Sequence, residues 1–325
     1  MTGWGCLLGM FASYLKSRFG VRLCIMFCGL VSSTGLIVCA YATNVYLLLL
    51  GIILTGFMYL QENIALGIVP EYFDKYYNLA VNIYGFGSGL AVVVYPLLVQ
   101  MAQDHYGWHG ALLLLGALTT HSLIFGALIK HNKAEKSLSI PLIRDNPQGE
   151  IDKTNFILNL KFLTSILKRC DANLLTDPSF IFRVVLPGIA NGYTVSGWLI
   201  YIVSFALSVG ATRAEASLVA TTGGIGLMII RIALPFLNSI MTYRQLLYAS
   251  SITMAASLAL MTLFQSIPML SVMSMIFCLG TGTLTTEIYI AARDVTEDDQ
   301  YINAVSWFHL SFGFSMIAGG TLSGK

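Results

Sequence analysis

An arginine surrounded by apolar residues is the clearest candidate for chemistry in this chain. Arg231 lies near the middle of the run from Gly223 to Pro235, in which it is the one charged residue. A guanidinium keeps its proton in proteins and costs about 3 kcal/mol at the centre of a bilayer, so it normally faces a bundle interior or a water-filled cavity. We expect Arg231 to hold an anion there. The alternative is a structural arginine paired with a carboxylate of the bundle.

Two acidic residues in other apolar runs are candidate partners for that cation, Glu62 and Glu287. Either could form a charge pair with Arg231 while no solute is bound, and a carboxylate solute or a proton would then break the pair. Glu62 lies between two amide residues, which favours a place in a cavity and makes it the first candidate for coupling. Glu287 could instead reach towards the cytoplasmic interface, beside the charges that follow it.

A set of neutral polar and aromatic side chains could complete a site around an organic anion. A guanidinium with neutral donors suits a carboxylate held through two hydrogen bonds, and aromatic rings would cover its carbon skeleton. The alternative is that these side chains line helix interfaces. The pattern fits a small organic anion or an amino-acid-like solute better than a sugar. The candidate substrate-binding residues are Arg231, Asn63, Asn191, Tyr193, Ser196 and Trp198.

Motifs of enzymes do not stand out in this sequence. We find no metal-ligand spacing, nucleophile triad or phosphate-binding loop, so we predict no enzymatic activity, no cofactor and no metal. The stretch Gly85-Phe86-Gly87-Ser88-Gly89 follows no predicted strand and favours close helix packing. The net charge is only +2, which argues against nucleic acid as a partner.

The composition places the chain in a membrane. Hydrophobic residues make up 56% of the 325 residues and charged residues 10%, whereas soluble domains contain about 25% charged residues. The length fits about ten crossings of roughly 20 residues each. We predict an all-α polytopic membrane protein in which a polar stretch separates five crossings from five. The expected crossings are 2–15, 22–41, 45–69, 77–102, 109–129, 180–209, 214–237, 245–265, 268–291 and 302–323.

The distribution of basic residues predicts the orientation. Lysine and arginine are concentrated in connections that share one face with the polar stretch 130–179, and Arg213 alone lies in a connection of the opposite face. The positive-inside rule therefore makes 130–179 cytoplasmic. Within it, apolar residues at helical spacing predict an amphipathic helix, which lies either on the inner leaflet or against the bundle. These residues are Phe156, Leu160, Leu163 and Leu167.

Helix starts and breaks can also be placed. Asp177-Pro178 reads as an N-cap followed by the first helical residue, and Thr212 with Glu215 as a capping box. Pro187-Gly188 with Asn191-Gly192 is expected to loosen the sixth crossing, and Gly280 and Gly282 are expected to loosen the ninth. Because free backbone groups are tolerated at membrane depth only against protein or water, such breaks point towards a lumen.

Several motifs resemble those of major facilitator transporters and, more specifically, of the monocarboxylate transporter family. They are the loop 17–22, Glu71-Tyr72-Phe73-Asp74-Lys75 with Ala80 and Gly87-Ser88, Tyr106-Gly107-Trp108-His109-Gly110, Asp177-Pro178-Ser179-Phe180, Arg231 in its Gly-rich helix, and Asn303-Ala304.

The resemblance implies a major facilitator fold with about ten of twelve transmembrane helices in two pseudo-symmetric bundles. Residues 1–129 would form the N-terminal bundle (family helices two to six), 130–179 the cytoplasmic loop, and 180–325 the C-terminal bundle (helices seven to eleven). The first and last family helices are expected to be missing, as in a fragment or an isoform.

The resemblance also implies a function, which departures from the family pattern qualify. We expect transmembrane transport of a monocarboxylate or related small organic solute by alternating access, at the plasma membrane, with a single-span accessory glycoprotein as a possible partner. Proton-coupled members carry an Asp four residues before the helix-eight Arg, where this chain has Leu227, which argues against proton symport by the usual residues. Tyr76, Asn82 and His109 also depart from the pattern. The alternatives are a non-transporting sensor or scaffold and a facilitative carrier of aromatic amino acids.

Overall fold

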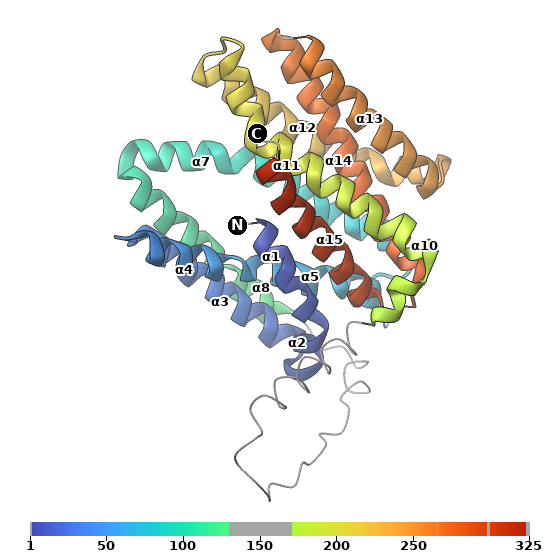
Figure 1. The fold of residues 1–325 in the computed structure, drawn as a ribbon. Helices are drawn as coiled ribbons and strands as arrows, with labels where there is room; N and C mark the ends of the chain where they lie inside the picture. Colours follow the sequence, from blue (N-terminus) through green and yellow to red (C-terminus); the bar gives the residue numbers. More distant parts are fainter. Residues whose placement is uncertain (1, 130–170, 265, 298–299, 323–325) are drawn as a thin grey trace, which may run out of the picture.

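The computed structural model describes residues 2–129, 171–264, 266–297 and 300–322 (Figure 1). These residues form helices joined by short connections, and no strand occurs among them. The amphipathic helix predicted over 156–167 lies outside the described residues. The described helices fall into a first group, α1 to α8, and a second group, α10 to α15.

The first group begins with a broken segment and continues into longer helices. Asn44 starts α4 as an N-cap, because its side chain accepts a hydrogen bond from the Leu47 amide at 2.8 Å. The elements are α1 (Thr2–Leu8), η1 (Gly9–Phe11), α2 (Ala12–Phe19), α3 (Val21–Ala40), α4 (Val45–Thr55), α5 (Phe57–Gly67), α6 (Val69–Tyr72), α7 (Tyr77–Thr120) and α8 (Ser122–Leu128).

The second group starts with the predicted caps, and both predictions are confirmed. The Asp177 side chain accepts from the Ser179 amide at 2.9 Å with Pro178 following it, and Thr212 and Glu215 form the reciprocal capping box. The elements are η3 (Ala172–Thr176), α10 (Pro178–Phe180), the π-helical turn η4 (Ile181–Val185), α11 (Leu186–Ser208), α12 (Arg213–Ile240), α13 (Tyr243–Leu263), α14 (Ile267–Val295) and α15 (Tyr301–Leu322).

Two expected crossings follow each other with only a sharp reversal of the chain between them. The crossings 77–102 and 109–129 both fall in α7 and α8, and the chain reverses within α7 at Gly107, whose backbone is not helical (φ 67°, ψ −179°) (Figure 1). Glycine adopts this positive φ without the steric cost that a side chain imposes. The reversal therefore depends on glycine at this position.

Seven helical segments among the described residues are long and apolar enough to cross a membrane. The expected crossings 77–102 and 109–129 share one of them, while 2–15 and 302–323 are not among the seven. The region 2–15 is divided between α1, η1 and α2. The seven are Val21–Ala40, Val45–Tyr72, Tyr77–Leu128, Pro178–Ser208, Arg213–Ile240, Tyr243–Leu263 and Ile267–Val295.

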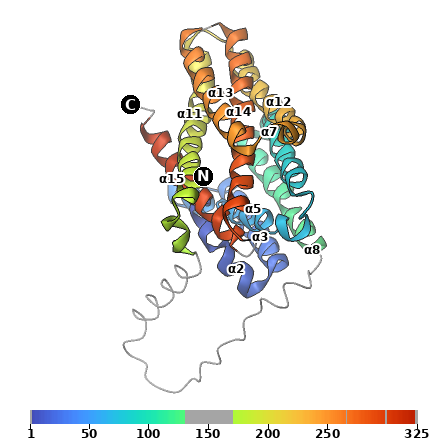
Figure 2. The ribbon, with the colours of Figure 1, turned by 90° about the vertical axis from the view of Figure 1, so that its right-hand side faces the viewer.

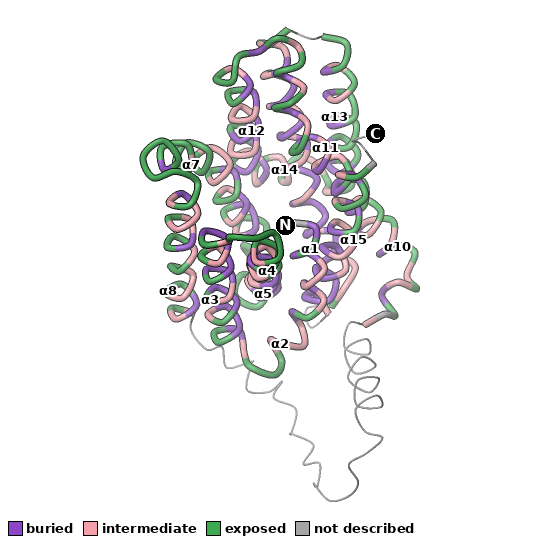
Figure 3. Tube along the Cα trace, turned by 60° about the vertical axis from the view of Figure 1, so that its left-hand side comes forward, coloured by how far each residue is buried: buried purple, intermediate pink, exposed green. Residues whose placement is uncertain are grey.

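Two helix pairs make the most extensive contacts between the groups. Within the second group α14 packs on α12 and α13, and within the first α3 packs on α4, α7 and α8. Between the groups, α7 packs on α12 and α1 on α15 (Figure 2). Buried residues lie mainly where helices face one another (Figure 3). Many large apolar residues are exposed. The outward faces suit a lipid environment.

The prediction that Gly280 and Gly282 break the ninth crossing was wrong, because α14 is continuous from Ile267 to Val295. A Cβ at Gly280 would lie 2.6 Å from Met254 Cγ on α13, and one at Gly282 would lie 2.6 Å from Ile230 Cγ2 on α12. These glycines let neighbouring helices approach closely. In the sixth crossing α11 is likewise continuous through Pro187-Gly188 and Asn191-Gly192, and the irregular turn is η4, directly before α11.

Candidate functional site

Arg231 lies in the seam between the two groups. It belongs to α12 and is buried, with an exposed fraction of 7%. Its guanidinium passes over Gly85 of α7, where an added Cβ would lie 2.5 Å from Arg231 Cζ and 2.7 Å from Nη1. The absence of a side chain at Gly85 therefore makes room for the guanidinium between the groups.

The guanidinium has unused hydrogen-bond donors. Nε and Nη1 are buried and have no hydrogen-bond partner in the described part of the chain, and neither Glu62 nor Glu287 forms an ion pair with Arg231 there. Leaving a charged donor buried and without an acceptor is costly. An oxyanion bound through two hydrogen bonds would satisfy such a group.

Two tyrosines and a carboxylate interact electrostatically with Arg231. Tyr84, Tyr289 and Glu287 are all close enough to interact with its charge. The Tyr84 hydroxyl donates to Glu62 Oε1 at 2.7 Å, which joins α7 to α5. Glu62 also interacts electrostatically with Tyr289. The two tyrosines therefore relate Glu62 to the arginine, while Glu287 interacts with the arginine directly.

A histidine completes this set. His309 Nδ1 contacts the Val305 carbonyl at 3.0 Å, so this nitrogen carries the hydrogen. His309 Nε2 then accepts from the Tyr289 hydroxyl at 3.3 Å. Both ring nitrogens are thus used by a neutral imidazole. We call the whole set the central cluster: Glu62, Tyr84, Arg231, Glu287, Tyr289 and His309.

Glu287 is a buried acid rather than an interfacial one. Its exposed fraction is 0%, so the alternative that it reaches towards the membrane interface was wrong. Neither carboxylate oxygen has a hydrogen-bond partner among the described residues, although the Asn238 amide of α12 lies close to it. A fully buried carboxylate without donors depends on nearby positive charge, which here is Arg231.

Two of the predicted binding residues, Asn63 and Asn191, lie inside the bundles. Asn63 is fully buried, donates to the Tyr59 carbonyl at 3.1 Å and packs against Gly9. Asn191 is also fully buried and donates to Thr285 Oγ1 at 3.1 Å, which links α11 to α14. The Tyr59 bond lies within α5 itself, and the other contacts are with neighbouring elements of the same group.

The other predicted residues of α11 separate from one another. Tyr193 is 44% exposed, and Ser196 is buried, faces Gly319 of α15 and donates to the Tyr193 carbonyl at 3.0 Å. Trp198 is buried and stacks on Phe277 with ring centroids 5.8 Å apart. Of these residues, Trp198 lines a pocket.

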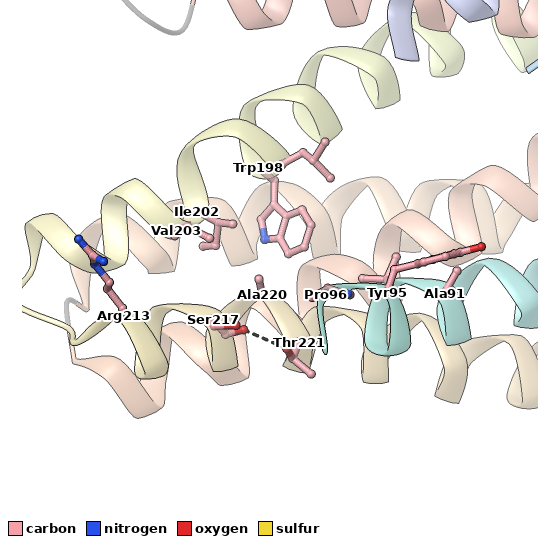
Figure 4. A pocket seen from close by; sticks show the side chains of 12 residues that line it. Ala91, Tyr95, Pro96, Trp198, Ile202, Val203, Arg213, Ser217, Ala220 and Thr221 are labelled. Atoms are coloured by element: carbon pink, nitrogen blue, oxygen red, sulfur yellow. Dashed lines mark hydrogen bonds between the residues drawn. The ribbon is translucent and has the colours of Figure 1, made fainter. Parts of the chain in front are cut away.

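That pocket has a volume of about 550 Å³ and lies between α7, α11 and α12 (Figure 4). Apolar and aromatic side chains dominate its lining, and the charge among them is Arg213. Arg213 precedes Arg231 by five helical turns, so the two share one face of α12 about 27 Å apart. The lining residues are Ala91, Val92, Tyr95, Pro96, Trp198, Leu199, Ile202, Val203, Arg213, Ser217, Ala220 and Thr221.

At the N-terminal end of α7, away from the pocket, an ion pair and hydrogen bonds connect the two helix groups. Arg293 Nη2 pairs with Asp74 Oδ1 at 2.5 Å, and its guanidinium lies 4.6 Å from the centre of the Tyr77 ring. The Tyr77 hydroxyl donates to the Tyr289 carbonyl at 3.2 Å and meets the Tyr301 hydroxyl at 2.6 Å. We call Asp74, Tyr77, Arg293 and Tyr301 the Asp74 clamp, because they tie α7 to α14 and α15.

The sequence did not identify three residues that lie around Arg231, which are Tyr84, Gly85 and Tyr289. Gly85 belongs to a stretch recognised as a packing motif, and Gly89 confirms that reading by lying close to Met228 of α12. Nothing in the stretch shows that Gly85 faces Arg231, because that depends on how α7 and α12 pair. Tyr84 and Tyr289 carry no pattern that separates them from other tyrosines of apolar helices.

Comparisons with known proteins show which proteins this chain is similar to. The family model of the Major Facilitator Superfamily matches residues 3–205. The chain is 32% identical over 219 residues to monocarboxylate transporter 12 of Xenopus laevis, covering 66% of this chain and 47% of that protein. It is 24% identical over 331 residues to monocarboxylate transporter 12 of Homo sapiens, covering 96% and 63% respectively. It is 38% identical over 119 residues to human monocarboxylate transporter 11, covering 36% and 25%. The matches thus span between a quarter and about three fifths of these relatives.

Proposed function

Because the chain belongs to the Major Facilitator Superfamily, we propose that it carries a small organic solute across a membrane by alternating access. Its apolar helices make it a multi-pass membrane protein. The observation that carries the proposal is the buried guanidinium of Arg231, which lacks acceptors for Nε and Nη1 in the described part of the chain and lies between the two helix groups. A site at this seam would be reached from either side as the groups rock.

The proposed solute is a monocarboxylate or a related small organic compound, and Arg231 holds its carboxylate. The names of the relatives, monocarboxylate transporters 12 and 11, support this class. Glu62 and Glu287 are the acids proposed to form charge pairs or to take part in coupling. Since the family resemblance implies an acid where this chain has Leu227, any coupling would use Glu62 and Glu287 rather than an acid at that position.

The two ends of the seam support a cycle of opening and closing. The Asp74 clamp closes one end in this structure, while the 550 Å³ pocket opens between the groups near Arg213 at the other. Alternating access requires the clamp to open and the Arg213 end to close. In both states of the cycle, Arg231 would lie between the Asp74 clamp and the Arg213 end.

The proposal includes an orientation and a location. The basic connections predict that the Asp74 end and residues 130–179 face the cytoplasm, and we propose the plasma membrane as the location. A single-span accessory glycoprotein remains a proposed partner, and co-purification of such a protein with the tagged chain would identify it.

The test is uptake of labelled carboxylates into cells or proteoliposomes at several external pH values. Arg231→Ala and Arg231→Lys are compared with Arg244→Ala, which removes the same charge from an exposed position, after correction for surface expression. We expect uptake to fall at least tenfold in both Arg231 variants and to persist in Arg244→Ala. Uptake that is unchanged in Arg231→Ala would remove this arginine from the mechanism.

A further inference from the structure

The pocket between α7, α11 and α12 is a second candidate binding site. Its volume of about 550 Å³ falls within the range of about 300–1,000 Å³ that is typical of pockets for small molecules. Tyr95, Pro96 and Ile202 contribute to a lining that is mostly apolar and aromatic, whereas Arg231 is not among the lining residues. The carboxylate site proposed at Arg231 therefore leaves this pocket without an assigned role.

Trp198 brings an unused hydrogen-bond donor to this pocket. Its indole extends from α11 into the pocket, with the nitrogen on the edge that faces the Arg213 end (Figure 4). Only 9% of the residue is exposed, and Nε1 has no hydrogen-bond partner in the described part of the chain. The stacked ring of Phe277 offers no acceptor. Because a buried donor without an acceptor is costly, a ligand oxygen at this point would be stabilised.

A cation lies at the other end of the pocket. Arg213 is the first residue of α12 and is exposed, and it forms no ion pair among the residues that the structure describes. The nearby acid Glu215 accepts hydrogen bonds from the amide and the hydroxyl of Thr212 instead. The amino end of a helix also favours negative charge. An anionic group of a ligand would therefore be stabilised beside Arg213.

The cation and the indole donor lie far apart along α12. From Arg213 to Gly223 this helix rises about 15 Å, and a Cβ added to Gly223 would lie 2.7 Å from Trp198 Cζ2. Between these two points the lining residues of α12 include the small residues Ser217 and Ala220. A ligand that used both polar groups would need an anion at one end, an acceptor at the other and a long apolar body between them.

From this arrangement we propose that the pocket binds an amphipathic organic anion of the steroid sulfate class, with its sulfate on Arg213 and an oxygen at the far end of its fused rings on Trp198 Nε1. A simple fatty acid would use Arg213 alone, because its chain carries no acceptor for Trp198. The Arg213 end must close during the transport cycle, so a ligand that fills the pocket holds this end open and inhibits uptake. This consequence rests on the proposed function, whereas the binding itself does not.

The test uses dehydroepiandrosterone sulfate, the same compound without its ketone, and the same compound without its sulfate. Binding to the purified full chain is measured from the shift of its thermal unfolding with ligand concentration, and inhibition of carboxylate uptake is measured in proteoliposomes. Trp198→Phe keeps an aromatic ring but removes the donor, and Arg213→Gln removes the cation. The matched controls are Trp4→Phe and Arg244→Gln, which change the same residue types at exposed positions outside the pocket.

We expect the unaltered chain to bind the complete probe about fivefold more tightly than the probe without its ketone, as for the loss of one hydrogen bond. Trp198→Phe should abolish this difference and leave the affinity for the ketone-free sulfate within about twofold. Arg213→Gln should weaken both sulfated probes about fivefold, as for one exposed ion pair, and leave the sulfate-free steroid unchanged. The selective loss of one preference in each variant distinguishes a ligand contact from a folding defect.

Three results would overturn the inference. If the steroid without its sulfate binds as tightly as the complete probe, the pocket is an apolar crevice for lipid. If Trp198→Phe keeps the preference for the ketone, the indole donor is not used. If Arg231→Ala abolishes binding of the sulfate while Arg213→Gln retains it, the anion is held between the helix groups instead. None of these results changes the carboxylate uptake expected of the Arg231 variants, so failure of this inference is distinguishable from failure of the proposed function.

Discussion

Replacing Gly85 with alanine should displace Arg231 without disrupting the fold. An added Cβ would lie 2.5 Å from Arg231 Cζ and 2.7 Å from Nη1, so the two groups cannot keep their positions. The obstructing atoms belong to the end of a flexible side chain, which can move at a cost of about 0.5–1.5 kcal/mol per strained torsion. We therefore expect Gly85→Ala to fold and to lose carboxylate binding.

The size of the effect follows from the hydrogen bonds that are lost. A hydrogen bond to a charged group is worth about 1.5–3 kcal/mol, which corresponds to a decrease in affinity of about 10- to 150-fold. Gly87→Ala is the matched control, because it makes the same substitution two residues further along α7, where no atom lies within 4 Å of the new Cβ. Both variants gain up to about 1 kcal/mol of helix propensity, so that contribution cancels in the comparison.

The assay is the apparent Kd of a short carboxylate or amino acid, measured by uptake inhibition and by thermal shift for both variants. Gly87→Ala should bind within twofold of the parent, and Gly85→Ala should bind at least tenfold more weakly with a similar unfolding temperature. Equal affinities in the two variants would refute the placement of the site at the α7–α12 seam. A large loss of stability in Gly85→Ala alone would show that Arg231 cannot move aside.

Three further predictions concern other parts of the chain. Tyr77→Phe removes the hydroxyl that bonds the Tyr289 carbonyl and the Tyr301 hydroxyl. Because this loss costs about 1 kcal/mol, amide hydrogen exchange at the start of α7 should become about fivefold faster. The control variant Tyr76→Phe should leave the exchange rate unchanged. Cys170 lies in the predicted cytoplasmic stretch, whereas the described cysteines are buried; an impermeant maleimide should label it only after permeabilisation, and labelling of intact cells would reverse the orientation. Gly192→Ala would press a Cβ against the Phe312 backbone of α15 and should lower the free energy of unfolding by about 1–3 kcal/mol. In the control variant Gly320→Ala, the new Cβ would meet only a movable Ile200 methyl group at 3.1 Å. Equal unfolding temperatures for the two variants would contradict this prediction.

Local signals in the sequence predicted the features that depend on neighbouring residues. Asp177 and the Thr212–Glu215 box cap their helices as expected, because a cap is decided within one turn. The apolar runs predicted the seven candidate membrane-spanning helices, although the expected crossings 2–15 and 302–323 are not among them. The role of Gly280 and Gly282 was predicted wrongly, since a glycine in an apolar helix can either break it or admit a neighbour.

The site was predictable only in part, because it depends on contacts between distant segments. A buried charge is conspicuous in an apolar sequence, so Arg231, Glu62 and Glu287 could be selected by residue type alone. The relation of Glu62 to Arg231 through Tyr84 and Tyr289, and the direct interaction of Glu287 with Arg231, depend on the packing of α5, α7, α12 and α14. The polar residues of α11 were chosen by type as well, and most of them contact neighbouring helices.

The energies of the site and of the clamp are of similar size, which is what a carrier requires. Asp74 is 91% exposed, so its pair with Arg293 contributes at most about 1 kcal/mol, and the Tyr77–Tyr301 hydrogen bond adds about 1 kcal/mol. Closing the seam around Arg231 without an acceptor costs about 1–3 kcal/mol, a cost that a bound carboxylate removes. Because a ligand shifts a conformational equilibrium only by its differential affinity for the two states, a solute on Arg231 can decide between states that the clamp separates by only a few kcal/mol. A much stronger clamp would hold one state whether or not solute is bound.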